Sequence, residues 1–154
     1  MKLSLKFKVE GRVQEVYQCF NKDLFLALNK GNAFPKATLV HYGDGKPGSE
    51  VKIELNFLLF KQLWISKITA EHQSPELCYF VDEGSTLPFF LKSWTHRHIV
   101  EYADPEHCYI AEEIEFEAKF PFADFMLYPA FKAQFQARGP IYENYFKSRA
   151  SLNA

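Results

Sequence analysis

The feature that most constrains the fold is a long stretch with apolar side chains at every second position. From about residue 36 to residue 118, short alternating segments follow one another, separated by turn-forming residues. The clearest segment runs from Val51 to Leu59. Because side chains on a β-strand point to opposite faces in turn, this alternation is typical of strands with one buried face. The short connections favour an antiparallel meander of six strands.

A strand and two short helices are expected before the meander. Residues 2–10 alternate apolar and charged side chains, which predicts a half-buried strand. Residues 13–20 and 24–28 carry apolar side chains at helical spacing. The second of these helices has a clear stop, because the residues after it can adopt the left-handed conformation that ends helices. These residues are Asn29, Gly31 and Asn32.

One long helix is expected after the meander, from Phe122 to the end of the chain. Its apolar stripe is aromatic, which suits packing against a broad sheet. Pro140 lacks the amide hydrogen that a helix interior needs, so we expect a kink or break at residues 138–140. The residues of the stripe are Phe131, Phe135, Tyr142 and Phe146.

These elements predict an α+β fold that forms one domain over residues 1–154. A curved antiparallel sheet has one face to cover, and a long terminal helix can lie across it. Because a sheet wrapped around a single helix rarely closes completely, we expect an apolar cavity between them. The aromatic content of 17% suits wide interior spaces or the lining of such a cavity.

Composition excludes several classes of function. The net charge of −1 and the absence of a basic stripe argue against nucleic acid as a partner. No apolar run approaches the roughly 20 residues of a membrane-spanning helix, so we expect no integral membrane association. Cys19, Cys78 and Cys108 are scattered and form no paired motif. Such cysteines suit buried positions in a reducing compartment, so we expect a cytoplasmic protein.

A pair of histidines lies in the most informative strand, at residues 93–102. The alternation places Trp94, His96, His98, Val100 and Tyr102 on one face, which we assign to the interior because it carries the bulky side chains. Residues two apart on a strand are about 6.5–7 Å apart at their Cα atoms. Both imidazoles are therefore able to face the same ligand.

The next strand brings a carboxylate to these histidines. A five-residue loop places Glu112 opposite His98, whereas a three-residue loop places it opposite Val100. A buried carboxylate stabilises an imidazolium, so the group can form a self-contained polar network, contact a ligand or act in acid–base catalysis. We predict no metal site and no cofactor, because two histidines and one glutamate are a thin ligand set. Asp82 is expected to initiate a turn by bonding to its own backbone.

Several segments resemble the bacterial "ligand-binding SRPBCC domain" family, within the superfamily of START lipid carriers and birch-pollen-type allergens. The resemblance covers nearly the whole chain, and Glu112 stands where the family more often has Asp. Its strongest part is F-V-D followed by P-F-x-x-x-W-x-H-x-H. The matching segments are KPGSEVKIEL (46–55), W-x-S-x-I (64–68), CYFVDE (78–83), LPFFLKSWTHRHIVEY (87–102), E-x-I-E-F (112–116) and QFQAR (134–138).

The resemblance implies a helix-grip fold and an internal pocket for a hydrophobic molecule. We therefore expect a non-enzymatic carrier of a small hydrophobic or amphipathic ligand. One alternative is a polyketide cyclase-, dehydratase- or hydrolase-like enzyme using His96, His98 and Glu112. Another is a ligand-free interaction module. The sequence is also compatible with a homodimer. The predicted ligand-binding residues are Phe25, Phe57, Trp64, Phe80, Trp94, His96, His98, Glu112, Phe131 and Phe135.

Overall fold

A computed structural model describes residues 1–31 and 34–153, and Asn32 lies outside these described residues. The elements follow the predicted order of a strand, two short helices, six strands and a long helical segment. In chain order they are β1 (Lys2–Glu10), α1 (Val13–Gln18), α2 (Lys22–Leu28), β2 (Lys36–Tyr42), β3 (Glu50–Asn56), β4 (Lys61–Gln73), β5 (Leu77–Thr86), β6 (Leu91–Asp104), β7 (His107–Ala118), α3 (Ala123–Gln136) and α4 (Arg138–Asn153).

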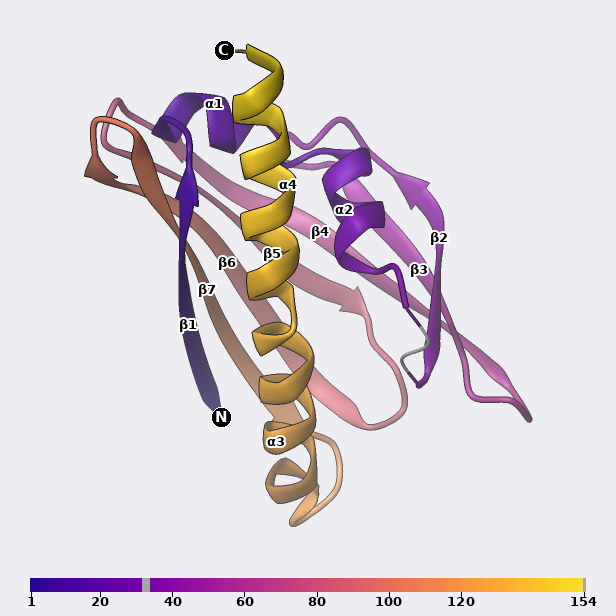
Figure 1. Ribbon diagram of the computed structural model, residues 1–154. Helices are drawn as coiled ribbons and strands as arrows, with labels where there is room; N and C mark the ends of the chain where they lie inside the picture. The colour runs from indigo at the N-terminus through magenta and orange to yellow at the C-terminus, as the bar shows by residue number, and fades with distance from the viewer. Residues whose placement is uncertain (32–33, 154) are drawn as a thin grey trace.

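The strands form one antiparallel sheet in the order β1-β7-β6-β5-β4-β3-β2. Strands β2 to β7 are the predicted meander, and β1 joins it by pairing with β7. Figure 1 shows the sheet curling around the C-terminal helices, while α2 covers the part near β2 and β3. Two strand ends differ from the prediction. β3 ends at Asn56 and does not continue to Leu59, and β5 continues past Asp82 to Thr86 because Glu83, Gly84 and Thr86 pair with β4 instead of turning.

The long C-terminal helix is bent, as predicted. Helix α3 ends at Gln136 and α4 begins at Arg138, so the break falls beside Pro140. Gly139 lets α4 approach the sheet, since a Cβ at this position would lie 2.9 Å from the ring of Phe7. Pro129 lies inside α3 and removes another helical hydrogen bond. Within residues 1–31 and 34–153, no helix is long and apolar enough to cross a membrane.

The core consists of two hydrophobic clusters on the covered face of the sheet. One cluster packs α1, α2 and α4 against the sheet and includes Val100, Ile110 and Tyr142. The other packs α3 against the sheet and includes Trp94 and Phe131. The break between α3 and α4 lies between the two clusters. Polar side chains that meet at this break are therefore enclosed by apolar layers on both sides.

The register of β6 and β7 settles the position of the predicted polar group. His98 pairs with Glu112, which is one of the two expected registers. Trp94, His96 and Val100 are buried, as their assignment to the inner face requires. Tyr102 is an exception, with 52% of its surface exposed. The regular pairing is disturbed between Tyr102 and Asp104, so the inner-face alternation does not extend to the end of β6.

Candidate functional site

A cavity of about 160 Å³, partly open to solvent, lies between the sheet and helices α2, α3 and α4. By the volume that a single water needs, it has room for on the order of ten water molecules. Its walls are mainly aromatic and aliphatic, with polar side chains both on the sheet side and on the helix side. The polar and ionisable residues of the wall are Asn21, Asn29, Tyr42, Ser66, Asp82, His96, His98, Gln134 and Arg138.

Most of the residues predicted to bind a ligand lie in this wall, but two do not. Phe57 follows the end of β3 and stacks on Phe60, with ring centroids 5.0 Å apart. Glu112 is fully buried and lies outside the wall. The predicted residues that line the cavity are Phe25, Trp64, Phe80, Trp94, His96, His98, Phe131 and Phe135.

Glu112 is the centre of a buried hydrogen-bond network. Its Oε2 is 2.5 Å from His96 Nε2, and its Oε1 accepts from the Tyr142 hydroxyl at 2.5 Å and from Arg138 Nη1 at 3.2 Å. The partners come from β6 and α4, so the network ties the last helix to the sheet. Glu112 therefore reaches the cavity through His96 and Arg138, which do line it.

The network sets the charge of its members. Although burial raises the pKa of Glu112, the charge of Arg138 and the contacts with His96 lower it well below its ordinary value. Burial and the neighbouring His98 lower the pKa of His96. Burial and the Glu112 carboxylate raise the pKa of Tyr142 well above its ordinary value. Glu112 is therefore an anion at neutral pH, and a neutral His96 donates its Nε2 hydrogen to it.

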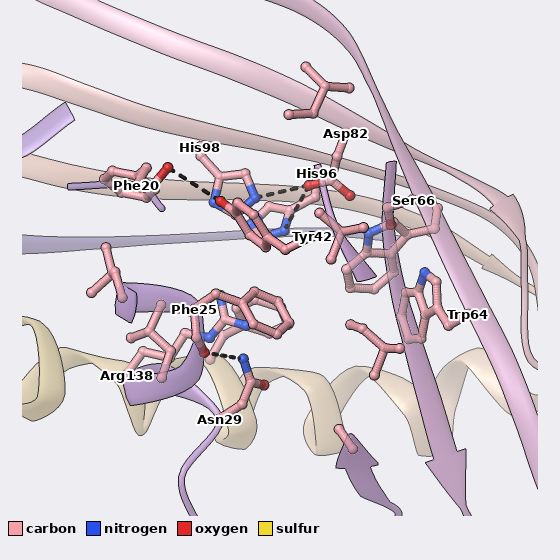
Figure 2. A pocket seen from close by; sticks show the side chains of 18 of the residues that line it. Phe20, Phe25, Asn29, Tyr42, Trp64, Ser66, Asp82, His96, His98 and Arg138 are labelled. Carbon is pink, nitrogen blue, oxygen red and sulfur yellow. Dashed lines mark hydrogen bonds and ion pairs between the residues drawn. The ribbon is translucent and has the colours of Figure 1, made fainter. Parts of the chain in front are cut away.

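Asp82 lies in the cavity wall and bonds to the second histidine. His98 Nε2 is 2.9 Å from Asp82 Oδ2, and His96 Nδ1 is 3.7 Å from the same oxygen. Figure 2 shows the three side chains side by side, with Tyr42 next to them and Arg138 on the helix side of the cavity. The expectation that Asp82 initiates a turn is wrong, because the backbone there continues as a strand and aligns Asp82 opposite His96.

The three side chains at this wall are able to hold a metal ion. Asp82, His96 and His98 each offer one ligand atom, and these atoms lie within 4.8 Å of one another. The two imidazole rings are also close, with centroids 3.7 Å apart. Although burial raises the pKa of Asp82, its hydrogen bond with His98 and the nearby imidazole of His96 lower it below its ordinary value.

Sequence reasoning missed three contributors to the site. Arg138 is part of the QFQAR segment, but the pattern gave no reason to aim it at Glu112. Tyr142 was assigned only to the apolar stripe of the helix. Tyr42 lines the cavity and donates its hydroxyl hydrogen to the carbonyl of Phe20 at 3.3 Å. A useful signal was the spacing of Arg138 and Tyr142, which are four residues apart and therefore share one helical face.

The pKa directions predict that the protein loses stability as the pH falls. The pKa of His96 is lower in the folded chain than in the unfolded chain, so its contribution is present above about pH 6.5 and is lost on acidification. The lowered pKa of Glu112 acts in the same direction at lower pH. Melting temperatures measured by calorimetry in EDTA should therefore fall from pH 7.5 to pH 5.

The variant His96→Gln provides the control for this pH dependence. Glutamine keeps a hydrogen-bond donor but does not titrate, so the fall of the melting temperature between pH 7.5 and pH 5 should become shallower. A wild-type melting temperature that rises over this range, or a His96→Gln curve as steep as that of the wild type, would contradict the assigned protonation states.

The fold is similar to that of several solved structures. A START superfamily protein from Mycobacterium smegmatis superposes with a TM-score of 0.70 at 12% identity, over 96% of this chain and 97% of that chain. The Zhui aromatase/cyclase from Streptomyces sp. R1128 gives 0.68 at 12% identity, over 97% and 95%. A point mutant of norcoclaurine synthase from Thalictrum flavum, bound to a transition-state analogue, gives 0.62 at 14% identity, over 92% and 91%.

These comparisons confirm the predicted fold. The chain has the helix-grip α+β fold seen in these structures, with a curled antiparallel sheet around a long bent C-terminal helix. At these identities the likeness shows the fold alone. No protein-family model matches the sequence. No curated protein matches it either.

Proposed function

We propose that the protein binds a small hydrophobic or amphipathic molecule in the internal cavity, and that residues 1–154 form one domain built around this pocket. The observation that supports this most strongly is the cavity itself, which has a mainly apolar wall and a few polar groups, among them Asp82, His96 and His98. This combination is typical of sites that enclose a ligand and fix its orientation with a few polar contacts. The apolar part of the ligand lies against α2, α3 and the sheet.

The polar end of the ligand lies near Asp82, His96 and His98 in this proposal. One polar atom of the cavity wall favours such a contact. The indole nitrogen of Trp64 is buried and has no hydrogen-bond partner among the described residues. Because an unpaired buried polar group costs roughly 1–3 kcal/mol, a ligand that bonds to this atom gains affinity.

Catalysis is the second candidate function, and the pair of His98 and Asp82 favours it. A histidine bonded to a carboxylate at a cavity wall is able to transfer protons as a general acid or base. Two solved structures with this fold are named as a cyclase and a synthase. In an enzyme, His98→Ala should reduce turnover by roughly 100-fold or more and largely keep binding. In a carrier, the same substitution weakens binding modestly.

Tryptophan fluorescence provides the test of ligand binding. The chain contains two tryptophans, Trp64 and Trp94, and both line the cavity. Titration with ANS, an amphipathic dye with an aromatic body and a sulfonate group, should therefore quench their emission with a saturable curve of one site per chain. Quenching that does not saturate would contradict the proposal. Saturable quenching that is unchanged when a bulky side chain fills the cavity would contradict it as well.

A further inference from the structure

We propose that Asp82, His96 and His98 bind one divalent transition-metal ion of the zinc class, with a remaining coordination position open to the cavity. The inference goes beyond the proposed function, because the ion can bind whether or not an organic ligand is present. The sequence argued against a metal site because it supplied two histidines and a glutamate. In the structure Asp82, and not the glutamate, lies with both histidines at the cavity wall.

The distances between the ligand atoms fit such an ion. Bonds of about 2.0–2.1 Å in a tetrahedral site place neighbouring ligand atoms about 3.3 Å apart. Asp82 Oδ2 is 2.9 Å from His98 Nε2 and 3.7 Å from His96 Nδ1, so the two observed distances lie on either side of that value. The ligand atoms of the three residues all lie within 4.8 Å of one another, so they can converge on one ion.

Glu112 holds both imidazoles in the orientation that the ion requires. Its Oε2 lies 2.5 Å from His96 Nε2 and 3.4 Å from His98 Nδ1. One buried carboxylate therefore faces the far nitrogen of each ring and directs the near nitrogens towards Asp82. Metal-binding histidines usually donate their second ring hydrogen to a carboxylate in this way. Tyr142 and Arg138 in turn fix Glu112.

Proton positions are compatible with metal binding. Without an ion, the Nε2 hydrogen of His98 lies between the ring and Asp82, and Nδ1 is buried without a hydrogen-bond partner among the described residues. When the ion takes the lone pair of Nε2, the ring hydrogen moves to Nδ1, where it faces Glu112. The same exchange frees Asp82 Oδ2 for the ion. Ring and carboxylate keep their total number of protons.

The charge of the site also favours a cation. Asp82 and Glu112 supply two negative charges, and Arg138 supplies one positive charge that is bonded to Glu112. A divalent ion at Asp82 offsets the remaining negative charge. His96 Nε2 lies 2.5 Å from the Glu112 carboxylate, so Nδ1 is the ring nitrogen that offers its lone pair to the ion, and metal ligation by histidine requires the neutral ring.

The open position gives the site its character. Three protein ligands with a fourth position open to a pocket are typical of zinc sites that act on a bound molecule, whereas structural sites are closed by four protein ligands. Because Asp82, His96 and His98 all line the cavity, the fourth position faces the space that an organic molecule would occupy. A water molecule or a polar atom of that molecule completes the coordination.

Titration of the purified chain with Co²⁺ and Zn²⁺, with no organic ligand present, tests the proposal. We expect one Co²⁺ ion to bind per chain and to give a visible absorption band. Zn²⁺ should displace this ion, and calorimetry measures Zn²⁺ binding in parallel. Asp82→Asn keeps the shape but removes the anionic ligand, so affinity should fall at least about 100-fold. Glu112→Gln removes the carboxylate that orients the rings, and such outer partners are worth about 10–100-fold.

His107→Gln is the matched control. Like His98, His107 is paired with an aspartate, since its Nδ1 is 2.7 Å from Asp104 Oδ1. His107 lies outside the cavity. This variant should bind Co²⁺ as the wild type does. The proposal is overturned if Co²⁺ binding is not saturable, or if Asp82→Asn and His107→Gln have the same effect. Neither outcome bears on ANS binding, so the carrier function is tested separately.

Discussion

Replacing Glu112 with leucine is expected to lower the free energy of unfolding by about 3–5 kcal/mol, the usual cost of removing one partner of a buried ion pair. Leucine is similar in size to glutamate, so the effect comes mainly from charge and hydrogen bonds. The substitution leaves the Arg138 guanidinium without its anion and the Tyr142 hydroxyl without its acceptor. Urea unfolding followed by circular dichroism measures the loss.

Two further variants show whether the loss of stability in Glu112→Leu comes from the unpaired buried charge. Glu112→Leu combined with Arg138→Met removes both ions, and replacement of a whole buried pair is often neutral, so stability should recover most of the way to the wild-type value. Glu113→Ala removes the adjacent exposed carboxylate, which lies 3.6 Å from Arg97, and should change stability by less than about 1 kcal/mol. A loss of under 1 kcal/mol for Glu112→Leu alone would contradict the buried network.

Filling the cavity from β2 is expected to abolish most ligand binding. Ala37 lines the cavity, so phenylalanine at this position would take the place of the ligand. Loss of about 100 Å² of apolar contact at about 25 cal/mol per Å² costs about 2.5 kcal/mol, or close to 100-fold in affinity. The ANS titration monitored by tryptophan fluorescence should therefore show about 100-fold weaker binding for Ala37→Phe than for the wild type.

Thr38→Phe is the control for this experiment. Thr38 is the next residue of β2, and its exposed side chain points to the opposite face of the sheet. The two variants add the same aromatic ring to the same strand, but only Ala37→Phe enters the cavity. Equal affinity of the two variants for ANS would mean that the dye binds elsewhere. Melting temperatures of both variants establish that each is folded.

The fold was largely predictable because each strand has one buried face. Alternation over residues 36–118 indicated the six strands of the meander, and the short connections indicated their antiparallel order. Strand ends were less predictable. Residues 83–86 contain Gly84 and polar side chains typical of a turn, yet they stay in β5 because three of them pair with β4 and Glu83 also pairs with β6. Pairing across strands outweighed local preference there.

The candidate site was predictable only where it lies on a single strand or on neighbouring strands. The alternation in β6 placed His96 and His98 on one face, and the hairpin offered two registers that brought Glu112 near them. Arg138 reaches the same carboxylate from the start of α4, at a position set by the helix break. A local pattern gives no information on such a contact, because it depends on how α4 crosses the sheet.

Asp82 illustrates the same limit and has the largest consequence. Its sequence neighbours suggested a turn, so its side chain was expected to form a hydrogen bond with its own backbone. In the structure it shares the cavity wall with His96 and His98, and this changes the inferred chemistry from a polar network to a metal-binding set. The aromatic residues were also placed incompletely by the sequence pattern. Phe57 belongs to the alternating pattern of β3, but the strand ends one residue before it.

Native mass spectrometry of the chain, purified from its own host under non-denaturing conditions, tests the central claim that the cavity holds a small molecule. We predict a species heavier than the 17.9 kDa chain by the mass of one organic molecule. This species should persist in EDTA, disappear on denaturation and be depleted in Ala37→Phe but not in Thr38→Phe. Repeated observation of the bare chain alone, together with no saturable ANS binding, would contradict the account.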